Sequence, residues 1–439
     1  MKKLRALVLA ESCNPDWFSV PLVGWSHCEA LHRLTDGLDA HVVTQLRNSD
    51  AFVRQGWQPG LDFTAVDSEL VARPMWQLDE ALRKKAHLGW TVSTALAPVS
   101  YAYFEYKAWQ RFGQEIKDHQ WDVVHRVTSL SPTVPSVIAG ACRRAGVPFV
   151  WGPINGGVPW PRGFHHQLRA EGEYLSYVRD AYKLLPYYRQ SRRDAAAIVI
   201  GSRDTWQQMS ARYRDRCVYI PENAVDPARF SRQVDGPVRS PLRVAFVGRL
   251  VPYKGADMLL EAAAPLVRAG KVVVDIIGDG DQMPELRRLV AAENLGAGVK
   301  LDGWVEHVKM QERLIESDVL GFPSIREFGG GVVLEAMALG LVPVVADYGG
   351  PAELVTDRTG YRVPMGTRAE LVARFRQVLG DLADNPTGLS TGLRAMGRQA
   401  RDRVFKMFTW DAKARQTLEV YRWVSGQRDK PDFGMPFPD

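Results

Sequence analysis

The sequence predicts an α/β protein built from two doubly wound domains that face each other across a cleft. Short apolar runs of strand length recur in both halves of the chain, and each is followed by a turn and a run of helix-forming residues. The chain has 439 residues, more than a single hydrophobic core usually serves. A long series of strands without intervening helices does not occur, which disfavours an all-β fold.

In the first half, the apolar runs predict strands that are buried on both faces of a parallel sheet. A polar stretch with prolines at 231–241 predicts a linker, so we assign residues 1–236 to the first domain. The predicted strands cover residues 4–10, 41–44, 123–127, 147–151, 196–201 and 218–220.

The second half repeats the strand–turn–helix pattern and predicts a second domain over residues 237–409. An amphipathic helix follows at 410–425. The predicted strands cover residues 242–247, 272–277, 299–304, 318–322 and 342–346, and a further amphipathic helix covers 368–379.

Composition narrows the class of protein. The net charge of +6 is modest for this length and does not by itself indicate a nucleic-acid partner. Apolar runs of about 18 residues, as a membrane-spanning helix needs, are absent from the sequence. The four cysteines form no C-x-x-C pair, which suits reduced thiols in a cytoplasmic protein. A Walker A motif is also absent, which disfavours a P-loop kinase or ATPase.

Two segments interleave basic and aromatic residues, at about 73–119 and at 174–193. Helices of this composition can lie on a membrane surface. They can equally pack on their own domain with a solvated polar face. Both interpretations stay open, and the first would place the protein peripherally at the inner face of the plasma membrane.

The segment 323–340 carries the strongest functional pattern. Glu327 and Glu335 lie eight residues apart across a predicted strand–turn–helix junction, with Gly329, Gly330 and Gly331 between them. The glycines would let backbone approach a ligand, and the helix N-terminus would face an anion. The carboxyl end of a strand is the usual ligand crevice of such a sheet. The alternative is a plain turn with solvated charges.

Two cations follow the strand predicted at 242–247. Arg249 offers a planar fork and Lys254 a compact point charge, and both stand on the loop at the carboxyl end of that strand. Such a pair suits the oxygens of a diphosphate. Ordinary solvated loop charge is the alternative.

The run EFGGGVVLEAMALGLVPV resembles glycosyltransferase family 4, and its two glutamates match the E-x7-E signature of retaining nucleotide-sugar glycosyltransferases. The resemblance is close in the second half and loose in the first. It implies a GT-B type architecture of two Rossmann-like domains, with the acceptor on the first domain and the donor on the second. The helix at 410–425 would pack back on the first domain.

The resemblance also implies the reaction. A hexosyltransferase of this kind moves a sugar from a nucleotide-diphosphate sugar to an acceptor hydroxyl with retention of configuration, without a metal or other cofactor. Its partners would be the nucleotide-sugar donor and a glycan or lipid-linked acceptor, with no nucleic acid. Polysaccharide, lipopolysaccharide or glycolipid biosynthesis would be the setting.

The family pattern assigns roles to residues of the second half. Glu327 and the Phe328–Gly330 amides would hold sugar hydroxyls, and Glu335 would accept hydrogen bonds from the ribose. Arg249 and Lys254 would stabilise charge on the leaving diphosphate. The remaining donor residues would be the amides of Val332 and Val333 at the helix start, and Gly303, Trp304 and Val305 near the base.

Acceptor or donor-sugar residues of the first half are less defined. Gly24 stands where the family commonly has a glycine pair that lets backbone amides approach the donor phosphate or the acceptor. The alternative is a loop glycine. His125 lies within a strand and faces either the core or the cleft. The strand at 147–151 ends in Trp151, where many family members have a histidine. The loop after it offers backbone amides from Gly152, Gly156 and Gly157 and the side-chain amide of Asn155.

Two other functions remain open. A nucleotide-sugar epimerase would share the architecture and would act without an acceptor. A catalytically silent sugar-nucleotide-binding partner would keep the site and lack turnover, and the missing histidine after Val150 gives that alternative some weight.

Overall fold

The computed structural model describes residues 3–86, 89–164, 167, 182–385 and 388–434. It confirms the predicted fold class, because the chain forms two α/β units, each around a parallel sheet. Unit 1 comprises Met1–Gly157, Gly172–Glu222 and Trp410–Asp439, and unit 2 comprises Val158–Glu171 and Asn223–Thr409. The first boundary between the two units after residue 172 falls between Glu222 and Asn223, whereas the sequence suggested that the first domain ends at residue 236.

Unit 1 contains a seven-stranded sheet in the order β3-β2-β1-β4-β5-β6-β7, and every pair of neighbours is parallel. Its strands are β1 (Leu4–Ala10), β2 (Leu38–Gln45), β3 (Phe63–Val66), β4 (Val123–Thr128), β5 (Phe149–Ile154), β6 (Ala197–Ile200) and β7 (Cys217–Tyr219). Its helices are α1 (Val20–Arg33), α2 (Ser49–Arg54), α3 (Glu69–Ala86), α4 (Gly89–Lys117), α5 (Ala139–Arg144), α7 (Tyr188–Asp194), α8 (Arg203–Gln208) and α16 (Trp410–Val424), with 3₁₀ turns at Leu46–Asn48 and Ala211–Arg216.

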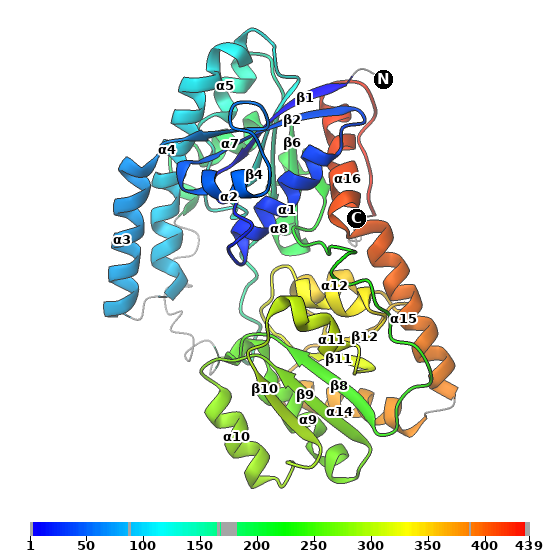
Figure 1. Cartoon of the computed structure of the whole chain (residues 1–439). Coiled ribbons are helices and arrows are strands. Elements are labelled where there is room, and N and C mark those ends of the chain that lie inside the picture. Colours follow the sequence, from blue (N-terminus) through cyan, green and yellow to red (C-terminus); the bar gives the residue numbers. More distant parts are fainter. Residues whose placement is uncertain (1–2, 87–88, 165–166, 168–181, 386–387, 435–439) are drawn as a thin grey trace. The chain divides into compact units, whose positions relative to one another are not determined.

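Helices cover both faces of this sheet. Along β1, Ala6 and Val8 point into one hydrophobic cluster, while Leu7 and Leu9 point into another. Residues of α1 and α16 belong to the first cluster, and residues of α4 and α5 belong to the second. Because strand side chains alternate between faces, a continuous apolar strand requires this double cover. Helix α16 thus packs on unit 1 beside α1 (Figure 1).

Unit 2 contains a six-stranded parallel sheet in the order β10-β9-β8-β11-β12-β13. Its strands are β8 (Leu242–Val247), β9 (Val272–Ile277), β10 (Val299–Gly303), β11 (Val319–Phe322), β12 (Val342–Ala346) and β13 (Tyr361–Val363). Its helices are α9 (Ala256–Arg268), α10 (Met283–Ala292), α11 (Met310–Leu314), α12 (Gly331–Ala338), α13 (Gly349–Leu354), α14 (Arg368–Asp384) and α15 (Gly388–Met407), with 3₁₀ turns η4 (Pro252–Lys254) and η5 (His307–Lys309).

Each sheet has a point at which the strand order reverses. It lies between β1 and β4 in unit 1, and between β8 and β11 in unit 2. Loops leaving the two strands at such a point diverge and open a crevice beyond their carboxyl ends, where ligands bind in folds of this kind. These two positions are therefore where a functional site is expected in each unit.

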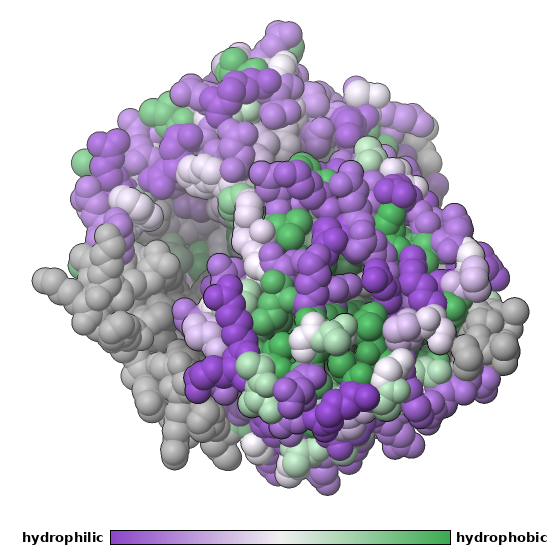
Figure 2. Space-filling model, turned by 60° about the horizontal axis from the view of Figure 1, so that its bottom comes forward, coloured by the Kyte–Doolittle hydropathy of each residue, from purple (hydrophilic) through white to green (hydrophobic). Residues whose placement is uncertain are grey.

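The segment at about 73–119 forms parts of α3 and α4, which pack side by side (Figure 1). Among the described residues, no helix is both long and apolar enough to cross a membrane. The face in Figure 2 is mainly hydrophilic, with hydrophobic residues showing between the hydrophilic ones. Much of the basic and aromatic segment at 174–193 lies outside the described residues.

Candidate functional site

In unit 2, the loops that follow β8 and β11 are joined by hydrogen bonds. The Ile325 N–H donates to the Tyr253 carbonyl at 2.9 Å, and the Ser324 hydroxyl donates to the same oxygen at 3.2 Å. The cation-bearing turn η4 and the loop that carries Glu327 therefore form one structure at the switch point of this sheet.

Lys254 and Glu327 form an ion pair across these two loops. The Lys254 ammonium donates to Glu327 Oε2, and the two side chains are only 17% and 19% exposed. Neither charge is left alone in this half-buried position, where an unpaired charge would be costly. The pair presents one cation and one hydrogen-bond acceptor at the same place.

Arg249 lies on the same loop, and its guanidinium is exposed. Its Nη2 donates to the Tyr253 hydroxyl at 3.0 Å. Tyr253 was not among the predicted site residues, although it stands directly before Lys254 in the run GRLVPYKG. A phenol at this point holds the guanidinium beside Lys254, so the loop presents two neighbouring cations.

Helix α12 begins immediately after the glycine run. Its N-cap, Gly330, has φ of 63° and packs on Pro351, and a Cβ there would lie 3.2 Å from that proline. The Val333 N–H donates to the Gly330 carbonyl at 2.9 Å, so this amide is engaged within the turn, whereas the resemblance assigned it to the ligand. The Gly331 and Val332 amides precede the first position with an intrahelical acceptor. They and the helix dipole favour an anion at this end.

Glu335 lies about one turn into α12, as predicted. Its Oε1 accepts a hydrogen bond from His307 Nε2 at 2.8 Å, and the two side chains are 19% and 36% exposed. His307 was not among the predicted site residues, since the sequence alone does not show that the loop after β10 reaches α12. Gly303 ends β10, and the exposed Trp304 and half-buried Val305 follow it on this loop.

Helix α13 supports the loop that carries Glu327 and Phe328. The Gly350 N–H donates to the Glu327 carbonyl at 3.0 Å, and a Cβ on Gly350 would lie only 2.0 Å from the Phe328 carbonyl oxygen. A side chain at residue 350 would therefore displace the loop. Gly350 belongs to the run GGPAEL, but the sequence does not show that this glycine packs against the carbonyl of Phe328.

His125 in unit 1 is a structural residue. The side chain is fully buried in β4, its Nε2 donates to the Gly152 carbonyl at 2.6 Å, and its Nδ1 accepts from the Tyr421 hydroxyl at 2.6 Å. Burial lowers the pKa of His125 to about 4, so the ring is neutral. The prediction that left a cleft position open for His125 is corrected: both ring nitrogens are used inside unit 1.

The loop after β5 is also bound internally. The Asn155 side-chain amide donates to Glu222 Oε2 at 2.6 Å, and the Gly156 N–H donates to the Thr205 hydroxyl at 3.3 Å. The Gly157 carbonyl accepts from Gln208 at 3.0 Å. A Cβ on Gly152 would lie 2.2 Å from the Val199 carbonyl oxygen. The Asn155 side-chain amide and the Gly156 N–H are therefore engaged within unit 1, where the sequence had suggested donation to a ligand. For the Gly152 and Gly157 amides that suggestion stays a prediction.

Gly24 lies inside α1, not in a loop before it. A Cβ on Gly24 would lie 2.4 Å from the Ser12 carbonyl oxygen and 2.9 Å from the Thr128 methyl group. The missing side chain thus lets α1 pack closely on Ser12, which follows β1, and on Thr128 at the end of β4. The expected approach of a donor phosphate or acceptor to Gly24 is corrected, because the protein's own backbone occupies the space beside it.

Comparison with known proteins shows that most of unit 2 is similar to one protein family. Residues 228–389 match the family model described as "Glycosyl transferases group 1". Every predicted residue of the unit 2 site falls within this segment. The α-maltose-1-phosphate synthase of Mycolicibacterium smegmatis is 31% identical over 227 residues, which are 47% of this chain and 57% of that protein.

A second relative is the phosphatidylinositol N-acetylglucosaminyltransferase GPI3 subunit of Saccharomyces cerevisiae, 24% identical over 44% of this chain and 41% of its own length. The chain thus spans about half the length of the curated relatives it matches. Among solved structures, Anabaena Alr3699/HepE in complex with UDP aligns over 95% of this chain and 99% of its own, with a TM-score of 0.58 and 16% identity. The fold is therefore of the GT-B type, with two Rossmann-like domains.

Proposed function

We propose that this protein is a glycosyltransferase that moves a sugar from a nucleotide-diphosphate sugar to an acceptor hydroxyl. The observation that carries the proposal is the assembly of Arg249, Lys254, Glu327 and the start of α12 at the switch point of unit 2. This assembly lies within the segment that matches glycosyl transferases group 1. Function is argued from this site, since the fold alone supports many activities.

The chemistry follows from the charges. Departure of the nucleotide diphosphate builds negative charge on its oxygens, and groups already aimed at those oxygens lower the barrier most. The Arg249 fork, the Lys254 ammonium and the first amides of α12 supply such groups. Glu327, held by Lys254, would accept hydrogen bonds from sugar hydroxyls, and Glu335, held by His307, would do so from the ribose.

We also propose that transfer retains the anomeric configuration and requires no divalent metal. Two cations on the loop after β8 would supply the positive charge that the leaving diphosphate needs. Gly303, Trp304 and Val305, at the end of β10, are proposed to lie at the nucleotide base. The acceptor is proposed to be a glycan or a lipid-linked glycan.

The first test is a panel of nucleotide sugars in thermal unfolding. A donor that binds only the folded protein raises the unfolding temperature by mass action. We expect one nucleotide-diphosphate sugar to do so and to be hydrolysed slowly without an acceptor. A protein stabilised by none of these donors would contradict the proposal.

The second test separates the activities that share this architecture. NMR of the donor incubated alone shows whether its sugar is epimerised, and NMR of a transfer product shows the anomeric configuration. We expect an unchanged donor sugar and a retained configuration, with the same rate in the presence of a metal chelator. Epimerised donor, or an inverted product, would replace the corresponding part of the proposal.

A further inference from the structure

A groove in unit 1 remains outside the site described above. It consists of two adjoining cavities, and Arg47 and Trp76 line both of them. The outer cavity has a volume of about 600 Å³ and the inner cavity about 280 Å³. The outer volume alone is within the range of small-molecule sites.

The inner cavity lies at the carboxyl ends of central strands. Ser12 follows β1, Gln45 ends β2 and Ser129 follows β4, and all three line this cavity. Strands β1 and β4 form the switch point of the unit 1 sheet. The groove thus occupies the position at which this type of sheet binds ligands.

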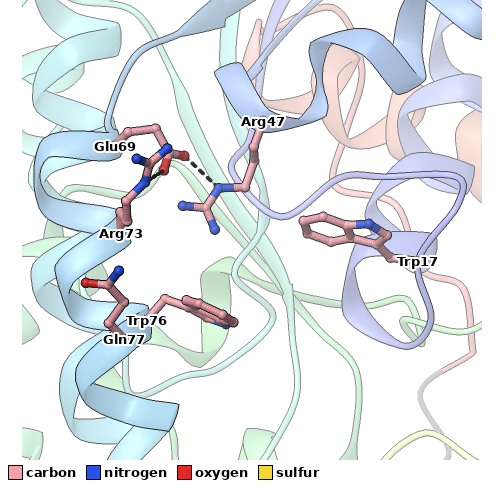
Figure 3. A pocket seen from close by; sticks show the side chains of 6 residues that line it. All are labelled: Trp17, Arg47, Glu69, Arg73, Trp76 and Gln77. Carbon is pink, nitrogen blue, oxygen red and sulfur yellow. Dashed lines mark hydrogen bonds and ion pairs between the residues drawn. The ribbon is translucent and has the colours of Figure 1, made fainter. Parts of the chain in front are cut away.

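Two tryptophans shape the outer cavity. Trp17 and Trp76 are 43% and 53% exposed, unusually high for such large aromatic side chains. Figure 3 shows their indoles on either side of the Arg47 guanidinium. Flat apolar faces with a polar edge suit the C–H face of a sugar ring, which would remove them from water.

Arg47 supplies an anion-binding group between these indoles. Its Nε donates to Glu69 at 2.7 Å, and Glu69 also lies 3.7 Å from Arg73. The two terminal nitrogens of Arg47 have no hydrogen-bond partner in the part of the chain that the structure describes. Two guanidinium groups and one carboxylate line the outer cavity, and the Glu11 carboxyl of the inner cavity lies within electrostatic range of Arg47. The free fork of Arg47 matches a carboxylate or a phosphate.

The inner cavity offers partners for hydroxyl groups. Tyr101 is 1% exposed, yet its hydroxyl has no hydrogen-bond partner among the described residues. Glu11 accepts a hydrogen bond from Gln45 Nε2 at 2.9 Å and keeps further acceptor capacity. A buried hydroxyl without a partner is costly, so a ligand that completes its hydrogen bond is favoured.

We propose that this groove binds the acceptor, and that the acceptor is a carbohydrate bearing an anionic group. One sugar ring packs on Trp17 and Trp76, its carboxylate or phosphate binds the free fork of Arg47, and a hydroxyl reaches Tyr101 in the inner cavity. The identification of this ligand as the acceptor rests on the proposed function. The chemistry of the ligand rests on the groove alone.

The binding test uses the full chain and ligand-observed NMR with four probes. These are methyl glucoside, methyl glucuronide, glucose 6-phosphate and inorganic phosphate. We expect at least one anionic sugar to bind about tenfold more tightly than methyl glucoside and inorganic phosphate, because a hydrogen-bonded charge pair adds to ring packing. The two anionic sugars distinguish a uronic acid from a sugar phosphate. Equal binding of the neutral sugar, equal binding of inorganic phosphate, or no binding of either anionic sugar would overturn the inference.

Variants locate the binding. Arg47→Gln and Trp76→Ala should each weaken the preferred anionic sugar about tenfold or more. Arg54→Gln is the matched control, because Arg54 is an exposed arginine of the same unit that is likewise paired, with Asp16. Unchanged affinity in Arg47→Gln and Trp76→Ala would overturn the assignment of the groove.

Tyr101→Phe distinguishes a role of the Tyr101 hydroxyl in ligand binding from a role in stability. Since the hydroxyl has no partner in the described protein, its removal should leave the unfolding temperature unchanged or higher while the affinity for the anionic sugar falls several-fold. A lower unfolding temperature with unchanged affinity would overturn the role of Tyr101.

A parallel donor measurement separates the two proposals. If nucleotide sugars stabilise the wild type and all variants alike while the anionic sugars fail to bind, the acceptor inference falls and the proposed function stands. If no nucleotide sugar binds but an anionic sugar binds in the groove, the proposed function falls and the groove remains a carbohydrate site.

Discussion

At the scale of single residues, the two glutamates of the E-x7-E pattern are both paired with a side chain of unit 2. Lys254 holds Glu327, and His307 holds Glu335. Both carboxylates are half-buried, and each partner comes from a loop distant in sequence. The pairs orient both carboxylates before a donor arrives, so less ordering is needed on binding.

We expect Arg249 to contribute to the rate of the proposed transfer and not to the stability of the protein. Its guanidinium is exposed, so Arg249→Gln should leave the unfolding temperature unchanged and lower kcat about a hundredfold, since a preorganised charge at the leaving group is lost. Steady-state kinetics and thermal unfolding measure the two effects. Arg268→Gln, at a surface ion pair with Glu293, should change neither. A normal rate in Arg249→Gln would remove Arg249 from the site.

His125 should make the protein sensitive to acid. Its pKa is about 4 in the folded protein against an ordinary value of 6.5, so the unfolded chain takes up the proton first as the pH falls. Stability is therefore full above pH 6.5 and declines toward pH 4, by about 3 kcal/mol at most from this residue. The neighbouring His27, whose pKa burial also lowers, adds to the decline.

Thermal unfolding at pH 7 and pH 5 measures this effect. The acid-induced drop in unfolding temperature should be smaller in His125→Gln than in the wild type. An equal drop in both proteins would show that His125 does not titrate in this way.

At the scale of elements, α12 illustrates how neighbouring glycines differ in what they do. Gly330 needs its positive φ to start the helix against Pro351. Gly331 has ordinary backbone angles, and a Cβ there would meet Asn223 at 3.6 Å, a normal contact. The first glycine is thus required by the fold, while the second leaves the helix start open to a ligand.

Substitutions by alanine should separate these roles. Gly330→Ala should destabilise the protein by about 1–2 kcal/mol or more, because a side chain is strained at this φ and presses on Pro351. Gly331→Ala should leave stability within about 0.5 kcal/mol and weaken donor binding. Thermal unfolding with and without donor distinguishes them. Equal destabilisation by the two changes would contradict the assignment.

Helix α16 illustrates how a distant element completes unit 1. It supplies the Tyr421 hydroxyl to His125, the Thr417 hydroxyl to His27, and the buried ammonium of Lys413 to the Pro221 carbonyl. Such bonds tie the end of the chain to its first half. Burial lowers the pKa of Lys413 to about 7.

Tyr421→Phe should test this tie. The substitution leaves His125 Nδ1 buried without a donor, which should destabilise unit 1 by about 1–3 kcal/mol. Hydrogen exchange should rise in α16 and β4 and stay unchanged in unit 2. Tyr106→Phe, on the exposed face of α4, is the control with no expected effect. Unchanged protection in Tyr421→Phe would contradict the role of this bond.

At the scale of the whole molecule, each of the two units gathers a different set of side chains at its switch point. In unit 2 the loops after β8 and β11 gather cations and acids, and in unit 1 the groove at β1 and β4 gathers aromatic and hydroxyl groups. The two switch points thus differ in their chemistry, as we would expect if one binds the proposed donor and the other the proposed acceptor.

The net charge of +6 suggests a test of the proposed peripheral contact with a membrane. We expect the protein to float with anionic vesicles at low salt and to be released as the salt concentration rises, because surface charges are screened. Vesicles of neutral lipid are the control. Binding to both kinds of vesicle alike, or to neither, would contradict an electrostatic contact.

Much of the fold was accessible from the sequence. Residues 4–10, 242–247, 272–277 and 342–346 were predicted as strands and are β1, β8, β9 and β12, since a run buried on both faces is apolar throughout. The short edge strands β3 and β13 were missed, because few of their residues are buried and the pattern is weak. Gly24, for which a loop position was one alternative, lies within helix α1.

The sequence by itself determined the fold class and the E-x7-E segment, because strand periodicity, glycine turns and nearby charges are local features. Only the tertiary structure decided that His125, Asn155 and Gly24 contact other parts of unit 1, and that Tyr253 and His307 contact Arg249 and Glu335. It also decided that Trp17 and Trp76 line one groove. In each case the neighbour that occupies the space beside a residue comes from a distant part of the chain. That neighbour is set by sheet order and helix packing, which the local pattern does not encode.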